Sequence, residues 1–155
     1  MRVRARIAAA ALALGALGFA AVPAASAGQQ PPNGSNVSAQ ATPNRCGSGY
    51  SLIDSERLDH TGRLIGVVYL YYSNATGKNC AFTEKLVSHG TPTLLIAQLH
   101  RGDGHKAVDR NKYKYYAGPV YLFAPSACIR WGGSVTTAPP DDREDNYLSP
   151  WEHCG

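Results

Sequence analysis

Apolar and polar residues alternate with a period of two through much of the chain after residue 46, whereas the 3.6-residue period of an amphipathic helix is absent there. β-Branched and aromatic residues fill 66–73 and 80–87, and the turn-rich segment 74–79 separates them, which is the pattern of a β-hairpin. Further strands are predicted at residues 50–53, 94–99, 112–123 and 128–131. The chain is therefore expected to form one small all-β domain, an antiparallel β-sandwich or barrel of about six strands.

The first 27 residues have the pattern of a secretory signal peptide. Three arginines without an acidic residue precede an apolar stretch at 7–22, and Ala25 and Ala27 supply small residues before a cleavage site. An N-terminal membrane anchor is the alternative, but it requires a longer apolar segment. Residues 28–45 are rich in Gln, Pro, Asn, Ser and Gly, so we expect a flexible leader there. The folded domain is expected at 46–155, in a protein that is secreted to the outside of the cell.

Four cysteines, Cys46, Cys80, Cys128 and Cys154, lie in the expected domain. Behind an export signal, an even number of cysteines favours two disulfides over metal ligation, and these spacings are not those of a zinc site. Three pairings are possible. The lower entropic cost of closing short loops favours Cys46–Cys80 with Cys128–Cys154, whereas nesting Cys80–Cys128 inside Cys46–Cys154 would restrict the unfolded chain more.

Charge and hydropathy argue against two classes of partner. The formal net charge of +4 falls to +1 once Arg2, Arg4 and Arg6 are removed with the signal peptide. A nearly neutral domain lacks the electrostatic footprint of a protein that binds nucleic acid or anionic membranes. No apolar stretch after the N-terminus is long enough to span a membrane. We therefore expect no nucleic acid partner and no membrane contact after the signal is cleaved.

Residues 132–150 contain two glycines, three prolines and the acidic run 141–145. An acidic run can mark a site for hard cations, which take several carboxylate oxygens as ligands. This run lacks the residue order of a calcium-binding loop, and Arg143 lies within it. We therefore expect a solvated loop there and no metal site.

The residues that most resemble a catalytic set are His100, Asp103 and His105, which flank one glycine-rich turn. Such a trio could bind a metal or act in acid–base catalysis. A polar hairpin loop explains the same residues, because glycines at positions 102 and 104 make rigid placement of a catalytic group difficult. Elsewhere the histidines lack the spacing of a helical zinc site, and no serine lies in a Gly-x-Ser-x-Gly elbow. We therefore predict no catalytic residues, no metal and no cofactor.

The tyrosine-rich stretch from Tyr113 to Tyr116 is the strongest candidate for a binding surface. In one continuous strand Tyr113 and Tyr115 would share a face, with Tyr116 and the neighbouring lysines on the opposite face. Tyrosine beside lysine suits stacking on sugars or polymers and contacts with proteins. Cross-strand aromatic packing is the alternative interpretation. We predict Tyr113, Tyr115 and Tyr116 as binding residues.

Trp131 follows Cys128 by three positions and precedes two glycines, Gly132 and Gly133. Glycine in a strand lets another backbone approach closely. We therefore expect Trp131 to be a buried structural anchor and not a residue that stacks on a ligand.

Several sequence blocks are distinctive. They are Cys-Gly-Ser-Gly-Tyr at 46–50 with Leu-Ile-Asp-Ser at 52–55, Val-Tyr-Leu-Tyr-Tyr-Ser-Asn at 68–74, Tyr-Tyr-Ala-Gly-Pro-Val at 115–120, Cys-Ile-Arg-Trp-Gly-Gly-Ser at 128–134 and Ser-Pro-Trp-Glu-His-Cys-Gly at 149–155. Through these blocks the domain at 46–155 resembles the spore-associated protein A family of streptomycetes and related actinobacteria. The resemblance implies an exported protein found with aerial hyphae and spores, and it implies no catalytic residues.

Together, the residues and the resemblance favour a secreted, non-enzymatic protein of the spore or aerial-hypha surface, acting as an interaction or structural envelope component. Its expected partner is a cell-wall or spore-surface polymer or protein. The alternatives are a small extracellular hydrolase that uses His100, Asp103 and His105, and a secreted protease inhibitor, for which a small disulfide-stapled β-domain is a common scaffold.

Overall fold

The computed structural model describes residues 42–155, which contain eight β-strands and no helix. The strands are β1 (Ser51–His60), β2 (Arg63–Ser73), β3 (Lys78–Lys85), β4 (Thr93–Arg101), β5 (Lys106–Tyr113), β6 (Tyr116–Phe123), β7 (Ile129–Thr136) and β8 (Glu144–Leu148). The predicted signal peptide and most of the predicted leader lie outside the described residues. Among residues 42–155 there is accordingly no helix that could cross a membrane.

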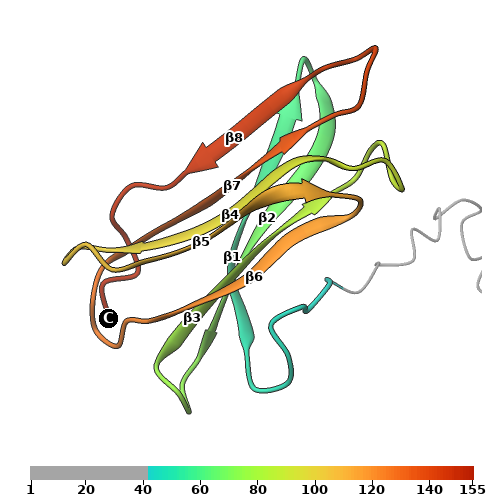
Figure 1. Cartoon of the computed structure of the whole chain (residues 1–155). Helices are drawn as coiled ribbons and strands as arrows, with labels where there is room; N and C mark the ends of the chain where they lie inside the picture. Colours follow the sequence, from blue (N-terminus) through green and yellow to red (C-terminus); the bar gives the residue numbers. More distant parts are fainter. Residues whose placement is uncertain (1–41) are drawn as a thin grey trace, which may run out of the picture. The chain divides into compact units, whose positions relative to one another are not determined.

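The strands form two four-stranded sheets, which appear as two layers in Figure 1. Sheet A has the order β1–β2–β3–β6 and sheet B the order β5–β4–β7–β8, and every pairing is antiparallel. The predicted all-β class is confirmed. The architecture is a sandwich and not a barrel, and it has eight strands where about six were expected.

The main core lies between the two sheets, where alternate residues of each strand point inward. In β4, Leu95 and Leu99 are fully buried while Ile96 and Gln98 are partly exposed, as expected for a strand with one buried face. Trp131 of β7 is 1% exposed, and its Nε1 donates a hydrogen bond to Glu152 Oε1 at 2.6 Å. The prediction that Trp131 is a buried anchor is confirmed.

The glycine at position 133 lets the two sheets approach closely. Directly opposite it, the Thr83 hydroxyl of β3 donates a hydrogen bond to the carbonyl oxygen of Ile96 in β4 at 2.6 Å. A Cβ atom on Gly133 would lie 2.5 Å from that carbonyl oxygen and 3.1 Å from Thr83 Cβ. A larger residue would therefore push β3 away from sheet B.

The cysteines pair as Cys46–Cys80 and Cys128–Cys154, the pairing that short loop closure favoured. The first disulfide joins the segment before β1 to β3, on the face of sheet A opposite the main core, where Tyr71 and Phe82 pack beside it. The second ties the C-terminal segment to the residue preceding β7. No free cysteine remains among the residues described.

Two predictions of local structure are wrong. The single strand expected at 112–123 is broken, because the chain leaves sheet B after Tyr113 and enters sheet A at Tyr116. The segment 132–150 is not mainly a loop, since it contains most of β7 and all of β8. Glu144 and Asp145 of the acidic run pair with β7, and Asp141 in the turn forms an ion pair with Arg63 at 3.5 Å.

Candidate binding site between β5 and β6

Three tyrosines converge where the chain crosses from β5 to β6. Tyr113 ends β5, Tyr116 begins β6, and Tyr115 lies in the turn between them. A pocket of about 310 Å³ is lined by these three residues together with Asp109, Lys114 and Gly118. The structure thus brings all three predicted binding residues together, although it does so through a turn and not through a shared strand face.

A β-bulge shapes the pocket at the start of β6. In the pairing of β3 with β6, Ala81 faces Val120 and Thr83 faces Ala117, so β6 carries one extra residue there. Gly118 lies in this bulge with a φ of +84°, and a Cβ on it would lie 2.8 Å from the carbonyl oxygen of Ala81. Glycine is therefore required at this position.

The carboxylate of Asp109 joins the edges of the two sheets. Its Oδ1 accepts a hydrogen bond from the Tyr113 hydroxyl at 2.6 Å, and its Oδ2 accepts one from the Gly118 amide at 2.7 Å. The hydrogen bond between the Tyr113 hydroxyl and Asp109, together with burial and the charge of Asp109, raises the pKa of Tyr113 above its ordinary value. The Tyr113 hydroxyl is therefore protonated at neutral pH and remains a donor to Asp109.

A buried lysine fixes the backbone of the turn. The Lys85 ammonium donates hydrogen bonds to Thr91 O at 2.7 Å, Thr93 Oγ1 at 3.0 Å and Tyr113 O at 3.2 Å, and the Lys85 amide donates to Tyr115 O at 2.9 Å. Burial lowers the pKa of Lys85, but the three acceptors match the three donors of its ammonium group. Lys85 therefore holds the backbone of Tyr113 and of Tyr115 at the same time.

The three rings differ in how much surface they offer. The guanidinium carbon of Arg45 lies 3.8 Å above the centroid of Tyr116, and Arg45 also pairs with Glu84 at 2.8 Å, so one face of that ring is covered. The Tyr113 hydroxyl is engaged by Asp109. Tyr115 is 51% exposed, and the centroid of its ring lies 5.9 Å from that of His89. Tyr115 is therefore the ring best placed to stack on a ligand.

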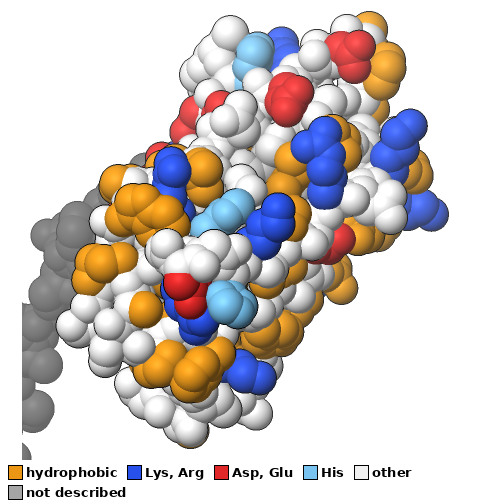
Figure 2. Space-filling model, turned by 60° about the vertical axis from the view of Figure 1, so that its left-hand side comes forward, with side chains coloured by type: hydrophobic (Ala, Val, Ile, Leu, Met, Phe, Trp, Pro, Cys, Tyr) orange, Lys and Arg blue, Asp and Glu red, His pale blue; other side chains and the backbone are white. Residues whose placement is uncertain are grey.

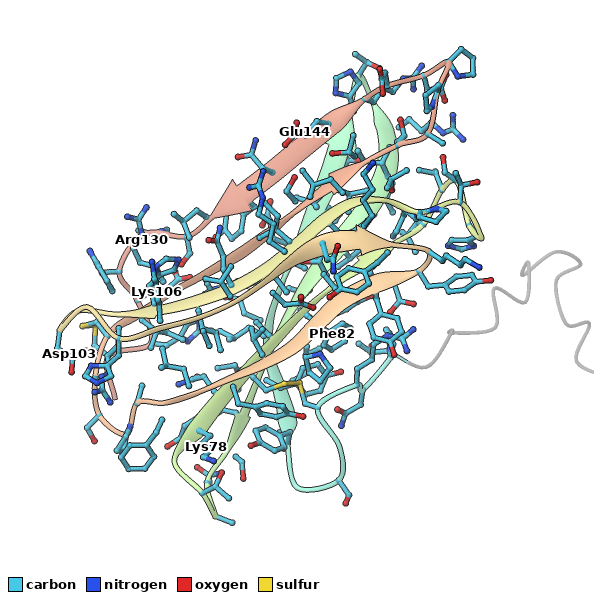
Figure 3. All side chains as sticks on the ribbon, in the orientation of Figure 1. Lys78, Phe82, Asp103, Lys106, Arg130 and Glu144 are labelled. Carbon is cyan, nitrogen blue, oxygen red and sulfur yellow. A yellow bond between two sulfur atoms is a disulfide. The ribbon has the colours of Figure 1, made fainter. Side chains whose placement is uncertain are left out.

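A row of basic residues leads along β5 to the pocket. Strand alternation places the exposed side chains of Lys106, Arg110 and Lys112 on one face, and Lys114 follows in the turn. Lys106 and Arg130 both pair with His100 in the register of sheet B, and Figure 3 labels Lys106 and Arg130 near each other at one end of this sheet. On the face shown in Figure 2, Lys and Arg side chains lie among hydrophobic side chains, and Asp and Glu side chains are present on the same face. The basic row along β5 can attract anions, and lysine on an edge strand also discourages pairing with another sheet.

The alternative catalytic residues do not converge on one reactive group. His100 Nε2 lies 3.1 Å from Gln98 Oε1, whereas His105 Nδ1 lies 3.1 Å from Asp103 Oδ1. The hydrogen bond from Arg101 holds the pKa of the Asp103 carboxyl well below its usual range. Asp103 is thus engaged by Arg101 in closing the β4–β5 turn, which is the hairpin loop that the sequence favoured.

Sequence reasoning missed three residues that organise the pocket, namely Asp109, Lys85 and Arg45. They come from β5, from β3 and from the segment before β1, and no short motif connects them. One signal was present in the alternation of residues along β3. Lys85 lies on the same inward face of β3 as Ala81 and Thr83. A lysine at such a position needs several hydrogen-bond acceptors around it.

Comparison with known proteins identifies one informative relative. The chain is 43% identical over 91 residues to spore-associated protein A of Streptomyces coelicolor, and the aligned stretch covers 58% of this chain and 56% of that relative. The match thus spans little more than half the length of the relative, and it is shorter than the 46–155 region across which the sequence blocks are spread. No family model matches the chain, and no solved structure matches it significantly. The resemblance to the spore-associated protein A family that the sequence blocks indicated is therefore confirmed by a curated relative of that name.

Proposed function

We propose that this protein is secreted to the surface of spores or aerial hyphae, where it acts without enzymatic activity by binding an anionic polymer of the envelope through the Tyr113–Tyr116 pocket. The name of its relative supports spore association. Two disulfides and the pattern of a signal peptide support an extracellular location.

The observation that carries the proposal is the exposed ring of Tyr115 on a backbone that Lys85 fixes. A rigid aromatic side chain offers a large apolar face at a small cost in conformational entropy, and its hydroxyl remains available to a polar ligand. Both oxygens of Asp109 accept hydrogen bonds from protein donors, and the ammonium of Lys114, which also lines the pocket, makes no hydrogen bond or ion pair with any of residues 42–155. Aromatic stacking beside a basic row suits a polymer that carries both sugar rings and negative charges.

Hydrolysis has weaker support than binding. His100 is engaged by Gln98, whereas Asp103 is held by Arg101 and pairs with His105, and none of the three lines the pocket of the tyrosines. A general base has to be held within about 2.6 to 3.2 Å of the proton that it removes. In the pocket itself, Asp109 and Tyr113 are bonded to each other, which stabilises the turn.

Retention on insoluble polymers tests the proposal. Purified, oxidised protein is incubated with actinobacterial cell walls, with spore walls and with chitin, and bound and free fractions are measured for the wild type and for Tyr115→Ala. Tyr121→Ala is the matched control, because Tyr121 is also a tyrosine on the β6 side of the molecule, is 42% exposed and does not line the pocket.

We expect the anionic walls to retain the wild type and Tyr121→Ala, with release at high salt because exposed charges are screened. Tyr115→Ala should bind at least about tenfold more weakly, since an aromatic anchor commonly contributes about 2 kcal/mol or more. Equal retention of Tyr115→Ala would contradict the proposal. Salt-independent retention on neutral chitin would contradict the anionic character of the ligand.

A further inference from the structure

Two carboxylates and one imidazole meet where the C-terminal segment approaches β1. Asp54, Glu152 and His153 each place one potential ligand atom so that all three atoms lie within 4.8 Å of one another. His153 Nε2 lies 3.3 Å from Asp54 Oδ2 and 3.9 Å from Glu152 Oε1, and all three side chains are open to solvent. No motif predicts this group, because Asp54 and His153 are 99 positions apart in the chain.

The fold fixes the two C-terminal members of this group. Glu152 forms an isolated β-bridge with Ile129, with both backbone hydrogen bonds at 2.9 Å. Its Oε1, the oxygen that lies 3.9 Å from His153 Nε2, accepts the 2.6 Å hydrogen bond from Trp131 Nε1, which fixes the orientation of the carboxylate. His153 directly precedes Cys154 of the second disulfide. A ligand carboxylate that is held by a buried donor is typical of a built metal site.

The third member comes from the opposite sheet. Asp54 lies on β1 at a register shift between Leu52 and Asp54 in the pairing with β2. A register shift of this kind can change the direction in which a side chain points. Here the side chain of Asp54 contacts His153 in the C-terminal segment. An ion bound by Asp54 and by Glu152 would therefore connect sheet A with the strand edge of sheet B.

A pocket of about 380 Å³ adjoins this group, and His153 is one of its lining residues. Asn79 of β3 lines the same pocket, and its side-chain amide is not among the buried polar atoms that lack a partner within residues 42–155. The pocket therefore offers a polar wall beside His153, from which water can reach an ion bound there.

We propose that Asp54, Glu152 and His153 bind a first-row divalent transition-metal ion, for which Zn²⁺ is the probe, at the mouth of the pocket that contains Asn79. Ligands about 2.1 Å from a tetrahedral ion lie about 3.4 Å apart, so adjustments of about 1 Å bring these three atoms into position. A mixed set of one nitrogen and two oxygens suits zinc or manganese, whereas calcium and magnesium prefer oxygen ligands alone. Three protein ligands leave a coordination position free on the side of the pocket.

Calorimetric titration of the oxidised full domain with Zn²⁺ tests the proposal, with tryptophan fluorescence as a second readout, because Trp131 donates a hydrogen bond to Glu152 and Trp151 directly precedes Glu152 in the chain. We expect one equivalent of Zn²⁺ to bind, and Asp54→Asn and His153→Gln each to weaken binding by at least about tenfold. His105→Gln is the matched control, because His105 also pairs with a carboxylate, Asp103 at 3.1 Å, but the two belong to no three-ligand group within residues 42–155.

Several results would overturn the metal site. These are the absence of binding at millimolar Zn²⁺, unchanged affinity in Asp54→Asn, or an equal loss of affinity in His105→Gln. If His153→Gln disturbs the fold, Asp54→Asn still decides the question, because Asp54 is partly exposed on an edge strand. Wall retention by the tyrosine pocket is measured without added metal, so either proposal can fail without the other.

Discussion

Replacing Gly133 with alanine tests the close contact between the sheets. The added Cβ would lie 2.5 Å from the carbonyl oxygen of Ile96 and would collide with the Thr83 side chain, whose hydroxyl bonds to that same oxygen. Overpacking of a core costs about 1–3 kcal/mol, and loss of the Thr83 hydrogen bond adds about 0.5–1.5 kcal/mol. We therefore expect Gly133→Ala to lower the free energy of unfolding by about 2–4 kcal/mol, a large part of the stability of a small domain.

Urea denaturation followed by circular dichroism measures this loss. Gly102→Ala is the control, because a Cβ on Gly102 would meet no atom within 4 Å, and its effect should stay within about 0.5 kcal/mol. Adding Thr83→Ala to Gly133→Ala removes the colliding hydroxyl, so the double variant should lose less stability than the two single losses combined. A Gly133→Ala protein as stable as the Gly102→Ala protein would refute the reasoning.

Three further outcomes follow from the structure. Trp131→Ala should cost about 3–5 kcal/mol in urea denaturation, because the ring is buried, and an unchanged midpoint would show that the ring does not anchor the core. Burial, with the nearby charges of Lys106 and Arg130, lowers the pKa of His100 in the folded protein. As the pH falls, His100 is therefore protonated at a higher pH in the unfolded chain than in the folded protein. Stability should therefore decrease below about pH 6.5, and His100→Gln should make the urea midpoint less sensitive to pH in that range; an unchanged profile would contradict the assignment. Alkylation of the unreduced protein followed by mass spectrometry should find all four cysteines unmodified, and stoichiometric labelling of any of them would contradict the two disulfides.

The strands predicted well from the sequence are interior strands rich in apolar residues. β4 buries one face, so buried and partly exposed residues alternate along it, whereas β2 and β3 carry apolar or aromatic residues on both faces because the cluster around the first disulfide covers the outer face of sheet A. β1, β5 and β8 are edge strands with mostly exposed, polar residues, and the pattern predicted them only in part or as loops. Pairing with one neighbour, and not local periodicity, makes these segments extended.

The tyrosines of the candidate site could be found from the sequence, but their arrangement could not. Their convergence depends on the chain changing sheets between Tyr113 and Tyr116, and on contacts from Asp109 and Lys85. The group formed by Asp54, Glu152 and His153 is even harder to predict from the sequence, because a disulfide and an isolated β-bridge position its C-terminal members. Long-range pairings of this kind leave no trace in residue spacing.

The central claim is that the tyrosine pocket is the surface that contacts the envelope polymer, and nuclear magnetic resonance tests it most directly. The labelled, oxidised domain is titrated with soluble fragments released from the walls that retain it, and shifts of the backbone amides are mapped onto the structure. The account predicts that the largest shifts occur at Tyr115, Lys114 and the neighbouring amides of the pocket, with smaller shifts along the exposed face of β5. Shifts that are largest around the pocket of Asn79 and His153, with those around Tyr115 unchanged, would contradict it.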